Sequence, residues 1–177
     1  MRIIAGRWKG RRLKAPRGKG VRPTSDRVRE AWMSAMGADV MDARVLDLFA
    51  GSGALGLEAL SRGAARVVFV ERARGALGVI RANVELVGAG AECTVVASDV
   101  FAFLRAREKG EEVFDLALAD PPYGTGDAAR LVLEFGRKPF AKELWFEHPW
   151  REALPLPVGA RTRRYGDTAL TTLKADS

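Results

Sequence analysis

Residues 120–123, Asp-Pro-Pro-Tyr, place a carboxylate, two imino acids and an aromatic ring side by side. The prolines fix the backbone and remove two N–H donors, so Asp120 and a nearby carbonyl would form a corner rich in hydrogen-bond acceptors. Such a corner suits the two N–H donors of an exocyclic amine on a nucleobase, and Asp120 can also take the proton that a reacting amine releases. Tyr123 offers a flat surface to a base that has left its stack. We therefore predict one catalytic group, made of Asp120, Pro121, Pro122 and Tyr123.

A second candidate site is the glycine-rich turn that follows the apolar run 45–49. It reads Gly51-Ser52-Gly53-Ala54-Leu55-Gly56, and Glu71 comes twenty positions after Gly51 at the end of the next apolar run. Glycines let a ligand approach the backbone closely, and an acid after the second strand accepts hydrogen bonds from ribose hydroxyls. The pattern predicts an adenosine cofactor held by Phe49, Ala50, Gly51, Ser52, Gly53, Glu71 and Arg72.

Asp47 narrows the choice of cofactor. Its carboxylate lies near the end of the first strand, where it would repel a pyrophosphate and attract a ligand that carries an ammonium and a sulfonium group. S-adenosylmethionine has both groups, although Asp47 could instead cap the following turn. After the third strand, Asp99 is placed to accept from an adenine amino group and Val100 to donate its N–H to the ring; a helix cap is the alternative for Asp99.

The elements that must position these residues alternate along the chain. Apolar and β-branched runs predict strands at 45–49, 66–71, 93–97, 115–119 and 144–147, with a closing hairpin at 161–165 and 168–174. Between them, helical spacing predicts helices near 28–36, 54–60, 77–88, 100–107 and 128–135. This alternation predicts an α/β fold with a mostly parallel sheet covered by helices on both faces, to which the hairpin adds antiparallel pairing.

The first 29 residues carry a strong positive charge, with eleven basic residues and one acidic residue, in a chain of net charge +7. Segments 2–5 and 11–14 flank a Gly6–Gly10 turn and predict a basic β-hairpin. We interpret residues 1–23 as an arm that binds nucleic acid and 24–177 as the catalytic domain. Thr24 is placed to close over the cofactor. The predicted RNA contacts are Arg7, Lys9, Arg11, Arg12, Arg22 and Arg27.

Composition excludes several other classes of protein. The single cysteine, Cys93, excludes an internal disulfide and a cysteine-built metal cage. The chain has no apolar run long enough for a membrane span and no signal-peptide core near its start. We expect a cytoplasmic monomer that uses neither a metal nor a membrane.

Several motifs together resemble a known enzyme family. The segments 2–6, 23–30 and 47–64 and the Asp-Pro-Pro-Tyr motif at 120–123 resemble the bacterial 16S rRNA guanine-966 N2-methyltransferase (RsmD) family along nearly the whole chain. The resemblance implies a class I S-adenosylmethionine-dependent methyltransferase fold, Rossmann-like with seven strands. It also implies a target guanine in the 16S rRNA of an assembled 30S subunit. Glu147-His148-Pro149 departs from the expected Glu-Ser type sequence and affects only the rim of the pocket.

Three rival functions remain open on the sequence. The acceptor corner also fits the amine of adenine, so an adenine-N6 methyltransferase on RNA or DNA is one rival. The glycine turn alone also fits a nicotinamide oxidoreductase. A non-catalytic rRNA-binding assembly factor is the third, because a basic arm would serve it equally well.

Overall fold

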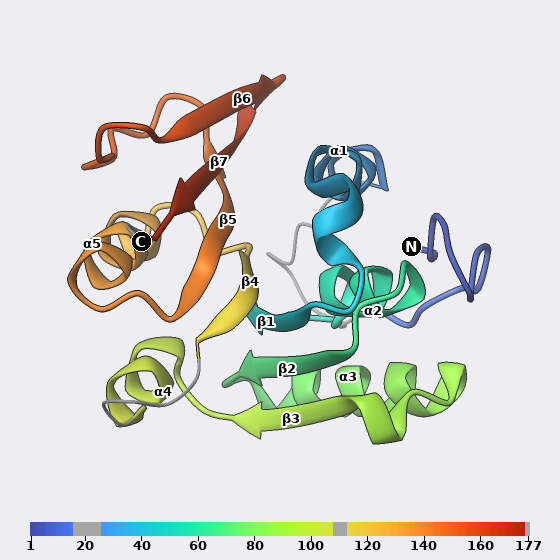
Figure 1. The fold of residues 1–177 in the computed structure, drawn as a ribbon. Helices are drawn as coiled ribbons and strands as arrows, with labels where there is room; N and C mark the ends of the chain where they lie inside the picture. Colours follow the sequence, from blue (N-terminus) through green and yellow to red (C-terminus); the bar gives the residue numbers. More distant parts are fainter. Residues whose placement is uncertain (16–25, 108–112, 176–177) are drawn as a thin grey trace.

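The computed structural model describes residues 1–15, 26–107 and 113–175, with the side chains of residues 26 and 27 outside the description. Its centre is one seven-stranded sheet in the order β3-β2-β1-β4-β5-β7-β6 (Figure 1). The strands are β1 (Arg44–Leu48), β2 (Arg66–Glu71), β3 (Cys93–Ala97), β4 (Phe114–Ala119), β5 (Ala141–Pro149), β6 (Arg161–Tyr165) and β7 (Thr168–Lys174). The helices are α1 (Asp26–Met36), α2 (Ala54–Ser61), α3 (Arg74–Val87), α4 (Val100–Ala106) and α5 (Asp127–Arg137), with 3-10 turns η1 (Gly37–Val40) and η2 (Gly90–Glu92).

The strand directions explain where a ligand can bind. Strands β1 to β5 are parallel, and β7 pairs antiparallel with both β5 and β6. The chain runs outward from β1 to β2 and β3, and then returns to place β4 on the other side of β1. Neighbouring connections therefore part at the carboxyl ends of β1 and β4, which is where ligands bind in open α/β sheets. The expected fold class is confirmed, and β5 is longer than the predicted 144–147 because Ala141 already pairs with Phe114.

Alternating side chains separate two cores on the two faces of the sheet. Val45, Phe69 and Leu118 belong to the core beneath α1, α2 and α3. Leu46 and Ala117, one position out of phase, belong to the core beneath α4 and α5. This period of two places Asp47, which follows the same alternation as Val45, on the α2 side of the sheet.

The N-terminal segment folds back on itself and packs against the body. Arg2 and Arg12 form an isolated antiparallel bridge, and Ile3 N–H donates to the carbonyl of Arg11 at 3.0 Å. Ile3 and Leu13 are buried in the same core as α1 and α2. The basic arm therefore contributes apolar side chains to the core while Arg11 and Arg12 stay exposed.

In the described part of the chain, no helix has the length and apolar character needed to cross a bilayer.

Candidate active site

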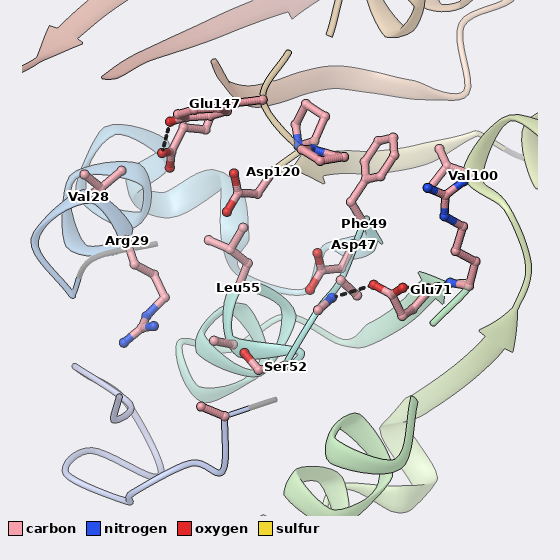
Figure 2. A pocket seen from close by; sticks show the side chains of 18 of the residues that line it. Val28, Arg29, Asp47, Phe49, Ser52, Leu55, Glu71, Val100, Asp120 and Glu147 are labelled. Atoms are coloured by element: carbon pink, nitrogen blue, oxygen red, sulfur yellow. Dashed lines mark hydrogen bonds between the residues drawn. The ribbon is translucent and has the colours of Figure 1, made fainter. Parts of the chain in front are cut away.

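A pocket of about 520 Å³ opens at the carboxyl ends of β1, β2, β4 and β5 (Figure 2). Each of these strands, or the loop directly after it, contributes an acidic side chain to the lining: Asp47, Glu71, Asp120 and Glu147. Asp99, which follows β3, is a fifth. Parallel strands bring their carboxyl ends to one edge, so acids far apart in the sequence meet around one space.

Asp47 is buried with only 1% of its surface exposed, yet its carboxylate reaches the pocket lining. Its Oδ2 accepts the backbone N–H of Gly56 at 2.9 Å. Burial raises the pKa of Asp47 well above its usual range. The hydrogen bond from Gly56 lowers this pKa, and the nearby Asp120 and Glu71 raise it further. Asp47 thus both holds the start of α2 and supplies a buried acid that a cationic ligand would stabilise as the carboxylate.

At Gly56 the helix α2 packs closely against the sheet. A Cβ atom there would lie 2.5 Å from Cε1 of Phe69 and 2.7 Å from Cγ1 of Val67. We expect Gly56→Ala to lower the free energy of unfolding by roughly 1–3 kcal/mol, because the core must shift to admit the methyl group. Gly78→Ala on α3 is the control, since a methyl group there would meet no neighbouring segment of the described chain within 4 Å; we expect it to stabilise by roughly 0.5–1 kcal/mol. Equal effects in urea unfolding would contradict the close packing.

Glu71 holds the backbone of two loops at the pocket, the glycine turn after β1 and the loop after β2. Its Oε2 accepts the N–H of Gly51 at 2.9 Å, and its Oε1 accepts those of Arg72 and Ala73 at 2.9 and 2.8 Å. Each carboxylate oxygen has two lone pairs, so a ribose hydroxyl can still donate to Glu71. Phe49, at the turn beside it, has a φ of 56°; the left-handed backbone of a bulky residue is a strained conformation that clusters at functional sites.

Asp99 performs the capping role that the sequence left open. Its Oδ1 accepts from Phe101 N–H and Ala102 N–H, both at 3.0 Å, and begins α4. Its Oδ2 lies 3.6 Å from Nη1 of Arg72. The cap thus uses Oδ1, and an adenine contact, which stays a prediction, would use Oδ2; the neighbouring Val100 lines the same pocket.

The Asp-Pro-Pro-Tyr segment is held in place by residues that the sequence motifs do not assign to the site. The Tyr123 hydroxyl donates to Oε1 of Glu147 at 2.8 Å and lies 3.0 Å from Oγ1 of Thr168. Burial raises the pKa of Tyr123 to about 12, with the carboxylate of Glu147 contributing and the Thr168 contact opposing. The ring is thus held by two hydrogen-bonding partners in the lining of the pocket that also contains Asp120. The sequence signals for Glu147 are its place at the end of the predicted strand 144–147 and the rim position that the family resemblance implies for residues 147–149.

The structure brings most of the predicted site residues together. The pocket lining includes all four predicted catalytic residues and every predicted cofactor residue except Gly53 and Thr24. Gly53 lies at the start of α2 with a φ of 76°. Thr24 and Arg22 lie outside the described residues, as does the side chain of Arg27. Residues of the lining that the sequence motifs do not predict are Met1, Ala15, Val28, Arg29, Ala54, Leu55, Ser98, Glu147 and Thr168.

The four predicted RNA contacts within the described residues are all exposed on the N-terminal arm. They are Arg7, Lys9, Arg11 and Arg12. Arg7 already pairs with Glu92 of η2 at 2.8 Å and lies 3.9 Å from the ring centre of Trp8. An RNA phosphate would therefore compete with Glu92 for Arg7.

Comparison with known proteins shows the family to which the chain belongs. The family model described as "Conserved hypothetical protein 95" (Cons_hypoth95) matches residues 1–172. The chain belongs to this family, the RsmD family. YlbH of Bacillus subtilis strain 168 is 36% identical over 181 residues, covering 98% of each chain. Ribosomal RNA small subunit methyltransferase D of Escherichia coli K12 is 43% identical over 126 residues, 71% of this chain. That match spans 62% of the relative, less than two thirds of its length.

The fold agrees with this assignment. The solved structure of the yhhF protein of Escherichia coli superposes with a TM-score of 0.84 at 31% identity, covering all of this chain and 98% of that one. The expected class I methyltransferase fold, with its seven-stranded sheet, is thereby confirmed.

Proposed function

We propose that this RsmD-family protein transfers a methyl group from S-adenosylmethionine to the exocyclic N2 of a guanine in 16S rRNA, with guanine-966 of the 30S subunit as the target. The observation that carries the proposal is the set of acids around one pocket: Asp47 and Glu71 beside the glycine turn, and Asp120 beside the two prolines. The family relative named as a small subunit rRNA methyltransferase supports the RNA class of the substrate.

The charge of the pocket favours a cationic cofactor. Asp47, Glu71 and Asp120 lie close enough to raise the pKa of Asp47 by mutual repulsion, after burial itself. A pyrophosphate would add negative charge to this cluster, whereas an ammonium and a sulfonium would relieve it. The donor set thus fits S-adenosylmethionine and disfavours a nicotinamide dinucleotide.

The chain's own residues would divide the work of the reaction. When bound, S-adenosylmethionine supplies an electrophilic methyl group on a positively charged sulfur. Asp120 would accept hydrogen bonds from the target amine and take the proton released as the N–C bond forms and the C–S bond breaks. Tyr123, held by Glu147 and Thr168, would position the base so that its amine lies in line with the bond between the methyl group and the sulfur. Such positioning can lower a barrier by roughly 7–11 kcal/mol.

The decisive experiment is to methylate small ribosomal subunits from a strain that lacks this activity and to identify the modified nucleoside. We expect N2-methylguanosine at one position of 16S rRNA. N6-methyladenosine would instead establish the adenine rival, and binding to particles without any methylation would establish the assembly-factor rival. Calorimetry with S-adenosylhomocysteine and with NAD separates the methyltransferase from the oxidoreductase.

Asp47→Asn tests the preference of the acidic pocket for a cationic cofactor. The native pKa of Asp47 is raised, so the wild type loses stability as pH rises from the ordinary carboxyl range through that raised value. We expect the variant to melt higher at neutral pH and to lack this loss. Because a charge-assisted contact disappears, its affinity for S-adenosylhomocysteine should fall about 10- to 100-fold. A variant that binds as tightly as the wild type would remove Asp47 from the cofactor site.

Neutralising the arm should weaken the salt-dependent part of RNA binding. The double variant Arg11→Gln, Arg12→Gln should flatten the slope of log affinity against log salt by about 1.5, at roughly 0.7–0.9 per phosphate contact. The control is Arg66→Gln, Arg105→Gln, which removes two exposed charges away from the arm and the pocket. Filter binding from 50 to 200 mM salt, about the range in which such contacts act, measures both. Identical slopes would contradict an RNA-binding arm.

A further inference from the structure

An exposed tryptophan and an arginine form a ready-made platform on the pocket rim. Trp150 directly follows β5, beside Pro149, which pairs with the pocket residue Thr168. The Trp150 N–H donates to the carbonyl of Asp167 at 2.9 Å, which fixes the backbone, while the side chain is 41% exposed. The guanidinium of Arg164 lies 5.2 Å from the ring centre and is itself held by its Nε, which donates to the carbonyl of Gly166 at 2.7 Å.

The surroundings of this platform suit a polyanion. Strand β6 is the edge of the sheet, and it presents Arg161, Arg163 and Arg164 to solvent. Arg151, next to Trp150, is exposed as well. Aromatic rings and arginine planes are the surfaces on which unpaired bases stack, and cations beside them bind the backbone phosphates.

We propose that the Trp150–Arg164 pair stacks on an unpaired base that flanks the target nucleotide. The inference rests on the proposed function and extends it, because the pocket itself holds only the flipped target. The platform adjoins that pocket because Thr168, which contacts the Tyr123 hydroxyl, pairs with Pro149 directly before Trp150. Met1 and Ala15 of the N-terminal arm also line the pocket. RNA bound to both the platform and the arm would therefore contact the protein on two sides of the pocket.

Trp150→Ala and Trp150→Phe test this proposal on the full chain. With undermethylated small subunits as substrate, we expect Trp150→Ala to raise KM roughly tenfold, as for the loss of one stacked base, with affinity for S-adenosylhomocysteine unchanged; Trp150→Phe should keep a KM near that of the wild type. Leu133→Ala removes an exposed apolar side chain on α5 and is the control. The affinity of Trp150→Ala for a protein-free 16S rRNA fragment should fall by the same factor. A loss seen only with the particle would assign the platform to a ribosomal protein, and an unchanged KM would overturn the proposal while leaving wild-type methylation intact.

A separate observation concerns Asn83, the only asparagine of the chain. It lies on α3 with no exposed surface. Its Oδ1 accepts the N–H of Lys14 at 2.8 Å, and its Nδ2 donates to the carbonyls of Lys14 at 3.0 Å and Ser52 at 2.9 Å. One buried side chain therefore joins the end of the described arm to the glycine turn.

A second contact supports the same connection. The Ser52 hydroxyl lies 3.5 Å from the sulfur of Met1, so the first residue of the arm contacts the turn directly and the other end of the described arm reaches it through Asn83. A change in the arm's position must therefore move Ser52 or break a buried hydrogen bond, which is costly.

We infer that Asn83 is a positioning residue that couples RNA binding on the arm to cofactor binding at the glycine turn. RNA bound to the arm would hold Lys14, and through Asn83 the Ser52 carbonyl, in the geometry that the cofactor needs. Coupling of this kind is reciprocal, so each ligand should raise the affinity for the other by the same factor.

The test measures the affinity for S-adenosylhomocysteine with and without saturating undermethylated small subunits, and the affinity for the subunits with and without saturating S-adenosylhomocysteine. The coupling ratio is the affinity with the second ligand divided by the affinity without it. We expect a ratio of about five in the wild type, at the low end of common couplings. Asn83→Asp keeps the acceptor for Lys14 N–H but loses both donors, so its ratio should approach one. Ser61→Ala is the matched control, because it releases the arm at Ala5 and Trp8 without touching Ser52; its ratio should stay near five.

A folding defect in the Asn83 variant would be visible in its melting midpoint. Lys14→Pro then provides a surface variant, since it removes the N–H that Asn83 accepts and leaves the Ser52 bond in place. We expect this variant also to lose the coupling. A wild-type ratio of one, or a ratio that survives both variants, would overturn the inference even if methylation itself is found.

Discussion

Asp120→Ala is expected to lower kcat for methyl transfer about 1000-fold or more, in the range set by removing a hydrogen-bonding group and a proton acceptor. Asp120 is half-buried directly after β4, at the pocket's acceptor corner. The affinity for S-adenosylhomocysteine should change little, because the glycine turn and Glu71 are held by their own hydrogen bonds. The measurements are methyl incorporation into small subunits and calorimetry on the same preparations.

Asp120→Asn separates the two roles of this carboxylate. An amide oxygen still accepts a hydrogen bond from the target amine but cannot take its proton at neutral pH. We therefore expect a rate between those of the wild type and the alanine variant. An alanine variant with a near-normal rate would end the acceptor-corner mechanism. Loss of cofactor affinity equal to the loss of rate would show that Asp120 mainly binds the cofactor.

The succession of strands and helices along the chain, and the places of Asp47, Glu71 and Asp120 near strand ends, could be predicted because both depend on local patterns. Short β-branched runs indicate strands, and an acid or a glycine turn after each run must reach the carboxyl edge of a parallel sheet. In the structure Asp47, Glu71 and Asp120 line one pocket, which is where such residues meet in a parallel sheet. The start of β5 could not be predicted, because Ala141 carries no strand signal of its own and is fixed by pairing with Phe114.

The parts that could not be predicted depend on contacts between distant segments. Asn83 has the pattern of an ordinary helix residue, yet it serves the arm 69 positions away. Glu147 supports Tyr123 from the next strand of the sheet, and this contact follows from the folded register alone. Asp99 has a cap signal and a cofactor signal at once, and the structure shows that one carboxylate oxygen serves the cap.

The arm, which composition marks as an RNA-binding appendage, is also attached to the body by one buried acid. Glu58 of α2 has no exposed side-chain surface, and its two oxygens accept the N–H groups of Ile4 at 2.8 Å and Ala5 at 3.0 Å. Arg62 donates its Nε to the same carboxylate at 2.8 Å, and Nε of the buried Arg29 lies 3.9 Å away. Gly6 follows with a φ of 81°, where a side chain would collide with the Ser61 carbonyl. The segment predicted to bind RNA therefore also contributes to the packing of the body.

Glu58→Ala is expected to lower the free energy of unfolding by roughly 3–5 kcal/mol, because it removes the carboxylate that lies opposite the buried guanidinium of Arg29. Two backbone N–H groups of the arm lose their acceptor as well. Glu92→Ala is the matched control, because it removes a solvent-exposed ion pair between the body and Arg7 of the same arm; such pairs contribute about 0–1 kcal/mol. Urea unfolding of both variants gives the comparison. If Glu58→Ala costs no more than Glu92→Ala, the arm is held by its other contacts, which are the buried Ile3 and Leu13 and the hydrogen bonds of Ser61 and Asn83, and the buried acid does not hold it.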